Sequence, residues 1–290
     1  MSHDSGEVRV RALLAAQPTG RELARAAFEP IGGGGLNRSW RVDTGGRAYF
    51  VRLANPATRA LGADGESEAA LLAIAGARRI APRLVLALPS EGLLVTEFLA
   101  GRMSGSDEVS QEGWLVRLAR LLAELHALPP APTVRRLDFS AQAAHLRALL
   151  DPGPHAVDAL ARRADAVFAR LRVAGDDVAL CHNDVHHANL VDHEGRLRLV
   201  DWEYGGVGDP VYDIAGFMCR HALDVRSTSV LLDAYKPGIR RERLLDACWA
   251  YDYVQWLWYR LASQRATLPV TGAGFAARAV ALGARLERAD

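Results

Sequence analysis

The stretch of sequence that decides the fold covers residues 181–204 and reads CHNDVHHANLVDHEGRLRLVDWEY. Three short apolar runs in it or beside it predict strands, at residues 178–181, 189–191 and 197–200. The polar residues between the runs then fall in loops. Asp184 and Asn189 share the first loop in a D-x-x-x-x-N spacing, and Asp201 directly follows the last run. The sequence thus predicts three oxygen-bearing side chains on loops next to buried strands.

These three side chains suit the transfer of a phosphoryl group from a nucleotide, in which the protein mainly positions groups and neutralises charge. We predict that Asp184 is the catalytic base, because a carboxylate can accept or orient the proton of an attacking hydroxyl. Asn189 and Asp201 are the predicted Mg²⁺ ligands, since this cation prefers oxygen. A D-x-x-x-x-N match can arise by chance in a polar loop, but the flanking strands supply the context that the motif requires.

A glycine-rich segment, residues 32–37, lies between two strand-like segments. Glycine lets the backbone approach phosphate groups without a side chain in the way. Gly34 and Gly35 are therefore candidate nucleotide-binding residues, and Asn37 and Ser39 could add donors to the phosphates. A flexible hairpin turn explains four adjacent glycines equally well.

Arg52 is predicted on a strand, and Glu68 lies on the helix predicted over residues 64–77. Arg52 should face the cleft of the fold, and Glu68 on the following helix is its obvious counter-ion. The alternative is an ordinary exposed ion pair, which contributes little to stability or function.

The first hundred residues predict a small antiparallel sheet with one embedded helix. Helical periodicity over residues 8–28 comes first, and four strands follow, at residues 40–42, 49–53, 84–88 and 93–98. After Gly101 helix-like segments dominate to the end of the chain. We therefore expect an α+β fold with two lobes, residues 1–97 and 98–290.

Composition limits the possible partners and compartments. The formal net charge of +1 provides no overall field for nucleic acid or an anionic membrane, and no apolar run approaches the length of a membrane span. Three widely separated cysteines favour a reducing compartment, so we expect a cytoplasmic protein, monomeric or homodimeric. Lys236 is the only lysine and stands beside a turn signal, which excludes a Walker phosphate loop and Schiff-base chemistry.

The segment 249–259 holds six aromatic residues in eleven positions. Part of it must belong to the core. Aromatic faces also attract quaternary ammonium and similar cations, and a nearby carboxylate would help. Trp256 and Tyr259 of this segment are therefore candidate substrate-binding residues, with Glu203 as the carboxylate and buried aromatic packing as the alternative. Trp202, between Asp201 and Glu203, is a further candidate.

Three histidines near the catalytic loop raise the question of a zinc site. His182, His186 and His187 lack the H-E-x-x-H pattern, and a turn rather than a helix is expected there. We predict a structural contact for His182 and no zinc.

Several segments together resemble the superfamily of choline kinases, thiamine kinases and aminoglycoside phosphotransferases, over roughly residues 31–259. The resemblance rests on GGLNRSW at 34–40, VRL at 51–53, CHNDVHHAN at 181–189, VDWEYGG at 200–206, and DP and YDIA at 209–210 and 212–215. It implies a protein-kinase-like fold, ATP and Mg²⁺ as cofactors, and the catalytic and metal roles assigned above.

Arg52 matches the cation that contacts the ATP phosphates, and Glu68 matches the helix carboxylate, although Glu66 is an alternative. It further implies an adenine-binding hinge at Thr96, Glu97, Phe98 and Leu99, and a bracing role for Asp213.

The predicted function is an ATP- and Mg²⁺-dependent kinase that phosphorylates the hydroxyl of a small cationic metabolite, choline or thiamine ahead of ethanolamine. An aminoglycoside phosphotransferase is the nearest alternative, because acidic residues such as Asp209, Asp213, Asp252 and Glu203 could bind polyamine sugars. A catalytically silent nucleotide-binding regulator is the alternative from another class.

Overall fold

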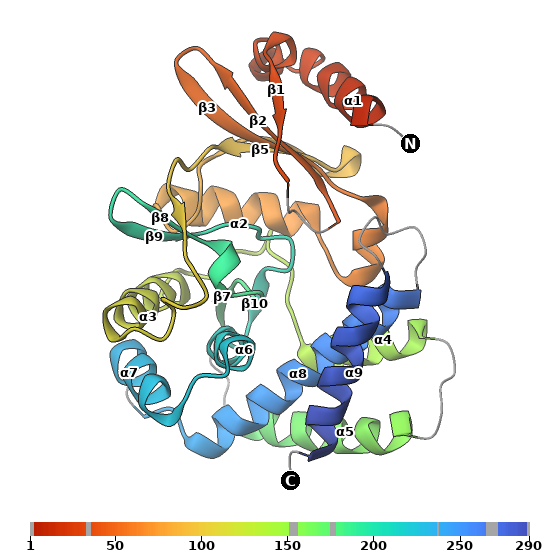
Figure 1. Ribbon diagram of the computed structural model, residues 1–290, viewed down its shortest axis with the longest axis vertical. Helices are drawn as coiled ribbons and strands as arrows, with labels where there is room; N and C mark the ends of the chain where they lie inside the picture. The colour runs from red at the N-terminus through yellow and green to blue at the C-terminus, as the bar shows by residue number, and fades with distance from the viewer. Residues whose placement is uncertain are drawn as a thin grey trace.

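A computed structural model describes residues 3–32, 36–150, 156–174, 178–236, 238–264 and 272–288. A five-stranded antiparallel sheet lies at one end of the molecule and a body of helices at the other (Figure 1). We call these parts the sheet layer and the helical body. Their arrangement confirms the expected α+β fold, in which the predicted catalytic segment joins the helical body.

The sheet layer contains α1 (His3–Ala15), the five strands of the sheet and α2 (Gly65–Ala77). The strands are β1 (Phe28–Pro30), β2 (Arg38–Thr44), β3 (Arg47–Leu53), β4 (Leu84–Leu88) and β5 (Leu93–Glu97), in the order β1-β2-β3-β5-β4. Gly45 and Gly46 both have positive φ, which allows the tight turn between β2 and β3. The predicted hairpin and the predicted helix over residues 64–77 are thus present.

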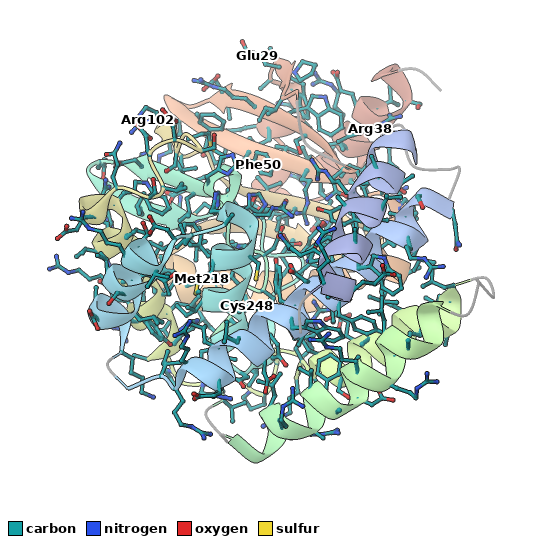
Figure 2. The ribbon with its side chains drawn as sticks, turned by 60° about the horizontal axis from the view of Figure 1, so that its bottom comes forward. Glu29, Arg38, Phe50, Arg102, Met218 and Cys248 are labelled. Atoms are coloured by element: carbon teal, nitrogen blue, oxygen red, sulfur yellow. The ribbon has the colours of Figure 1, made fainter. Side chains whose placement is uncertain are left out.

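Alternation along the strands gives the sheet two different faces. Val42, Val51 and Val95 pack in a small core with α1, while Arg52 and Phe50 point to the opposite face. Figure 2 shows Phe50 between the sheet and the helices. The face that carries Arg52 is therefore the one turned toward the helical body.

The helical body begins after β5. Its helices are α3 (Glu112–His126), α4 (Phe139–Leu149), α5 (Ala156–Ala174), α6 (Val211–His221), α7 (Val225–Tyr235), α8 (Arg241–Gln264) and α9 (Gly272–Arg288). Its strands are β6 (Arg102–Met103), β7 (Ala179–Cys181), β8 (Leu190–His193), β9 (Arg196–Leu199) and β10 (Gly206–Gly208). The three strands predicted around the catalytic segment correspond to β7, β8 and β9, within one or two residues.

One large hydrophobic core connects α2 to the helical body. Leu71 and Leu72 of α2 belong to the same buried cluster as Leu118 of α3 and Tyr253 of α8. Asp64 caps α2 by accepting hydrogen bonds from the first backbone N–H groups of the helix. The helix that carries Glu68 is consequently held by both parts of the molecule.

The helical periodicity over residues 8–28 does not correspond to one continuous helix. The helix ends at Ala15 and is followed by two short 3₁₀ turns, Pro18–Gly20 and Leu23–Arg25, and then by β1. Proline has no N–H to donate and disfavours a helical residue before it, so Pro18 ends the helix despite the continuing periodicity. Among the helices of the described ranges, none is both long and apolar enough to span a membrane.

Candidate functional site

The loop after β7 is held in place by a buried carboxylate from α6, which Figure 1 shows beside β7 and β10. Asp213 accepts hydrogen bonds from the backbone N–H groups of His182 and Asn183, at 2.9 and 2.5 Å. Asn183 has a φ of 63°, a left-handed conformation that this clamp helps to maintain. Asp213 therefore shapes the loop that leads to Asp184.

Asp213 is itself fixed by a residue outside the sequence motifs, His126 of α3. His126 of α3 donates from Nε2 to Asp213 (3.0 Å), and the Tyr235 hydroxyl lies 2.7 Å from the other ring nitrogen. Burial alone would raise the pKa of Asp213, but the His126 hydrogen bond and charge outweigh it and lower this pKa. His126 lies on the apolar stripe of α3 with Leu118 and Leu122, and a polar residue on such a stripe is a signal that could have identified it.

His126, Asp213 and Cys181 are close enough together to be considered as a metal site. The hydrogen bonds just described already use both carboxylate oxygens of Asp213 and both ring nitrogens of His126. Burial also raises the pKa of the Cys181 thiol, which disfavours the thiolate that a metal needs. The three residues fit a structural network better than a metal site.

Asp184 lies at the start of the predicted catalytic loop, next to Asn189. The Asn189 amide nitrogen donates to the Asp184 backbone oxygen (3.0 Å) and to its carboxylate (3.2 Å). His186 Nε2 lies 3.4 Å from the same carboxylate. Burial would raise the pKa of Asp184, but the hydrogen bond and charge of His186 lower it to about 2. Asp184 is therefore ionised at neutral pH and can orient a hydroxyl or accept its proton.

Asp201 follows β9 and points toward the sheet layer. It adopts a φ of 64°, and its Oδ1 accepts a hydrogen bond of 2.9 Å from Arg52. The neighbouring Val200 N–H donates to the backbone oxygen of Asn189, so the two predicted metal ligands lie on adjacent strand ends. Tertiary structure thus brings Asp184, Asn189 and Asp201 together as predicted from their spacing.

Arg52 is buried and forms the centre of a cluster of charged groups. It pairs with Glu68 of α2 and with Asp201, and its NH1 lies 3.8 Å from Glu203 Oε2. Burial would lower the pKa of Arg52, but the three carboxylates raise it well above its ordinary value. The pairing of Arg52 with Glu68 agrees with the prediction that the two interact, and burial excludes the exposed-pair alternative.

Glu203 lies in this cluster, on the sheet side of the site. Its Oε2 accepts a hydrogen bond of 2.9 Å from Asn37, which also accepts from the Asn55 backbone N–H. Burial, followed by repulsion from Asp201, raises the pKa of Glu203 to about 8. Its closest polar partners, Asn37 and Arg52, both come from the sheet layer.

The cluster around Arg52 has more acidic than basic groups. The oxygen atoms that they offer indicate whether Mg²⁺ would fit there. Three carboxylates, Glu68, Asp201 and Glu203, surround one arginine, and Glu68 Oε1 makes no hydrogen bond to the described residues. The Asn189 amide uses its nitrogen toward Asp184, which leaves its oxygen for a cation. A set rich in carboxyl and amide oxygens suits a hard divalent cation. The residues present therefore fit Mg²⁺.

The predicted nucleotide-binding residues of the sheet layer are only partly described. Gly34 and Gly35 lie outside the described residues. Ser39 is directly opposite Arg52 in the pairing of β2 with β3, so both side chains are on the same face of the sheet. Asn37 is engaged by Glu203 and Asn55, which indicates that it holds the end of the glycine-rich segment in place.

The predicted hinge, residues 96–99, connects β5 to the helical body. The backbone N–H of Phe98 donates to Ala48, and the Arg41 guanidinium lies 4.9 Å from the centre of the Phe98 ring. Thr96 is buried, and the Glu97 carboxylate accepts from Arg198 at 3.1 Å. The Leu99 backbone N–H makes no hydrogen bond within the described part of the chain, so it is available to a ligand.

The aromatic residues predicted to bind a cation do not form an open cage. Trp202 is buried under the catalytic loop, where its ring centre lies 4.8 Å from that of His182. Trp256 is buried as well, and the Arg260 guanidinium already covers its ring at 4.8 Å. The Tyr259 hydroxyl accepts hydrogen bonds from two other arginines. These positions favour the alternative of aromatic packing.

The carboxylates that could bind a polyamine sugar are engaged by arginines or by the backbone. Asp209 pairs with Arg243 at 2.5 Å, and Asp252 pairs with Arg285. Asp213 is fully buried and holds the catalytic loop. An acidic lining for aminoglycosides therefore lacks support from these residues.

Arg135 is a second residue that sequence motifs did not indicate. It precedes α4, and its guanidinium donates to the backbone oxygens of Gly62 (2.6 Å) and Gly205 (3.1 Å). Its own backbone N–H donates to Ser67 in α2. Gly205 must be small here, because an added Cβ would lie 2.5 Å from Leu71 of α2. Arg135 thus ties the start of α2 to the segment after Asp201.

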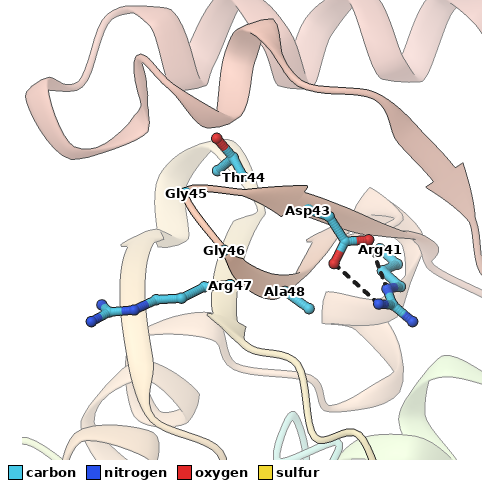
Figure 3. Close-up of a pocket in the computed structure, with 7 residues that line it drawn as sticks. All are labelled: Arg41, Asp43, Thr44, Gly45, Gly46, Arg47 and Ala48. Carbon is cyan, nitrogen blue, oxygen red and sulfur yellow. Dashed lines mark hydrogen bonds and ion pairs between the residues drawn. The ribbon is translucent and has the colours of Figure 1, made fainter.

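A separate hollow of about 510 Å³ lies beside the turn between β2 and β3 (Figure 3). Arg41 and Asp43 form an exposed ion pair at its edge, at 2.9 Å. The hollow is open to solvent and lies at the far end of the hairpin from Arg52. The charged cluster around Arg52, and not this hollow, contains the groups suited to catalysis.

Comparisons with known proteins identify the family and the fold. Residues 27–245 match the family described as the phosphotransferase enzyme family. Thiamine kinase of Salmonella typhimurium is 31% identical over 168 residues, which are 56% of this chain and 54% of that protein. Protein LicA of Haemophilus influenzae is 36% identical over 72 residues, 24% of this chain and 21% of LicA. The chain therefore spans about half the length of the first and a fifth of the second.

Solved structures show the same fold. The choline kinase LicA from Streptococcus pneumoniae superposes with a TM-score of 0.77, at 18% identity, over 98% of this chain and 100% of that one. A structure of LicA in complex with AMP gives the same TM-score at 19% identity, over 99% and 100% of the two chains. The fold is thus that of the protein-kinase-like choline kinases.

Proposed function

Because this chain belongs to the phosphotransferase enzyme family, we propose that it transfers the terminal phosphoryl group of ATP to the hydroxyl of a small molecule, with Mg²⁺ as cofactor. The observation that carries this proposal is the convergence of Asp184, Asn189 and Asp201 with the buried Arg52. These residues come from separate elements and meet at the junction of the sheet layer and the helical body. A silent regulator would not need Asp184 to be poised there.

Each residue has a role that follows from its contacts. Asn189 and Asp201 would hold Mg²⁺, which when bound neutralises charge on the phosphate oxygens. Arg52 would contact the phosphates, and its pairing with Glu68 fixes its direction. Asp184 would accept the proton of the attacking hydroxyl, with His186 and Asn189 keeping its carboxylate in position. Leu99 would offer its backbone N–H to the nucleotide base.

The nature of the alcohol is a finer question. Choline and thiamine remain our proposals from the sequence, and the relatives described as thiamine kinase and choline kinase support them. The engaged carboxylates Asp209 and Asp252 support an aminoglycoside less well. A cytoplasmic location and a monomeric or homodimeric state likewise stay predictions.

ATP turnover by the purified protein, measured with Mg²⁺ and a panel of small alcohols, tests the proposal. We expect ADP formation to depend on both Mg²⁺ and an alcohol, and to disappear in Asp184→Ala. If no alcohol stimulated turnover while Mg²⁺-ATP still bound, the regulator would replace the kinase.

A further inference from the structure

Two arginines converge on one tyrosine hydroxyl in the helical body, close to the catalytic loop. Arg220 of α6 donates to the Tyr259 hydroxyl at 3.0 Å, and Arg278 of α9 donates to the same oxygen at 3.3 Å. The Arg278 guanidinium also lies 5.6 Å from the centre of the Tyr259 ring. Two positive charges are therefore held near each other by a neutral group.

Neither arginine has a carboxylate within ion-pair distance among the described residues. Both side chains are accessible to solvent, whereas Tyr259 between them is buried. An arginine has five N–H donors, and each of these two spends one on Tyr259. Donors and positive charge are thus left over, although like charges held close together repel.

The position of Arg220 places this charge beside the reacting groups. Arg220 follows Asp213 by seven residues on α6, which puts both on one face of the helix, and that face holds the catalytic loop. Arg220 and Asp184 are near enough that each shifts the pKa of the other. His221, the next residue, accepts a hydrogen bond from the His187 backbone N–H in the same loop.

The other groups on this side of Asp184 do not neutralise the arginines. Burial, and then the neighbouring histidines and Arg220, lower the pKa of His221 to about 4, so this ring is uncharged at neutral pH. Glu203 faces Arg52, and Asp252 is paired with Arg285. Among these carboxylates in the described residues, Asp184 remains near the two arginines, and it must stay free to contact the hydroxyl.

We propose that Arg220 and Arg278 form an oxyanion-binding subsite for the acceptor, so that the phosphorylated alcohol carries a carboxylate or a phosphate group. This inference rests on the proposed function, because it assumes that Asp184 contacts the hydroxyl of the same molecule. Guanidinium groups bind such oxyanions with paired, directional hydrogen bonds. Choline and thiamine, the acceptors predicted from the sequence, would then be excluded, because their quaternary ammonium and thiazolium groups would meet two arginines.

The test measures binding of four small alcohols to protein saturated with Mg²⁺ and a non-hydrolysable ATP analogue, so that the nucleotide site is filled. Glycerate carries a carboxylate, glycerol 3-phosphate a phosphate, glycerol no charge and choline a positive charge. We expect at least one of the two anions to bind tenfold or more tightly than glycerol and choline. Their comparison distinguishes a carboxylate from a phosphate as the recognised group.

Substitutions assign this binding to the two arginines. Arg220→Gln together with Arg278→Gln should weaken anion binding at least tenfold, while the corresponding lysine double variant should retain part of it. Arg226→Gln, on α7 with a side chain 86% exposed, is the matched control and should bind the anions as the wild type does. All variants should bind the nucleotide analogue normally, because the arginines are on the acceptor side.

Tighter binding of choline than of both anions would overturn the inference, and so would equal anion binding by the glutamine double variant. A variant that lost affinity for the nucleotide rather than for the anions would assign Arg220 to the ATP phosphates instead. If the wild-type protein failed to bind the Mg²⁺-nucleotide, the proposed function would fall, and the anion measurement without nucleotide would still decide the subsite.

Discussion

Asp184 is a single carboxylate whose position and charge state both suit a catalytic base. Its pKa of about 2 keeps it ionised, and Asn189 and His186 restrict its orientation. Replacement by asparagine preserves the shape but cannot accept a proton. We expect Asp184→Asn to lower kcat by about 10²- to 10⁴-fold. The Kd for Mg²⁺-ADP, measured by titration calorimetry, should stay within about threefold of the wild-type value; a large loss of nucleotide affinity would point to a metal-binding role instead.

Arg52 is the residue on which the charged cluster depends. Removing it leaves Glu68, Asp201 and Glu203 without the cation that stabilises them in a largely buried setting. Loss of one partner from a buried ion pair typically costs about 3–5 kcal/mol, so Arg52→Met should lower the free energy of unfolding by roughly that amount. Urea denaturation monitored by circular dichroism measures the change.

The control for Arg52 lies on the neighbouring strand. Arg41 pairs with Asp43, and both side chains are about half exposed. Exposed ion pairs contribute little to stability, so Arg41→Met should leave the urea midpoint nearly unchanged. Similar losses of unfolding free energy in the two variants would show that the buried Arg52 cluster stabilises the fold no more than the exposed pair does.

At the scale of elements, one face of α6 holds the catalytic loop in place. Asp213 holds the start of the loop, and His221, two turns later, accepts from the His187 backbone N–H. His221 can accept only while its Nε2 is unprotonated. Stability of this contact should therefore depend on pH.

The direction of this pH dependence follows from the pKa of His221. Burial, and then the neighbouring histidines and Arg220, lower this pKa from 6.5 to about 4. Between these values the unfolded chain binds a proton that the folded protein does not, so stability is complete above pH 6.5 and falls as pH decreases toward 4. Because the ring is partly exposed, we expect a loss on the order of 1 kcal/mol across this window.

His221→Gln should flatten the dependence between pH 7 and 4 when urea midpoints are compared with the wild type. The exposed His145 on α4 offers the matched control, and His145→Gln should follow the wild-type curve. A His221→Gln curve as steep as the wild-type one would assign the dependence to another group.

At the scale of the whole molecule, the site joins the sheet layer to the helical body. Arg52 and Asn37 come from the first part, and Asp201 and Glu203 from the second. A ligand that binds across this junction stabilises only the folded state. Mg²⁺-ADP at about 100 times its Kd should therefore raise the Tm by roughly 4–8 °C.

The same thermal experiment separates the metal from the nucleotide. Adding EDTA, or replacing Asp201 by alanine, should remove most of the shift, because Asp201 is a predicted Mg²⁺ ligand. A shift that survived both changes would show that nucleotide binding does not use this metal site.

The sequence by itself determined the local framework of this protein. Apolar runs and turn residues placed the strands around Asp184 and Asp201 within one or two residues, since strand and turn preferences act over a few neighbours. The spacing of Asp184 and Asn189 and the pairing of Arg52 with Glu68 were likewise visible. Pro18 was the local signal for the end of the first helix, although the helical periodicity continues beyond it.

Only the tertiary structure decided which side chains share a site and which are buried. It placed Glu203 with Arg52, covered Trp202 and Trp256, and brought Arg220 and Arg278 from two helices onto Tyr259. Contacts of this kind join residues far apart in the chain, and they depend on how helices pack. Pattern and spacing along a sequence carry no direct record of that packing, whereas they record strands, turns and short loops.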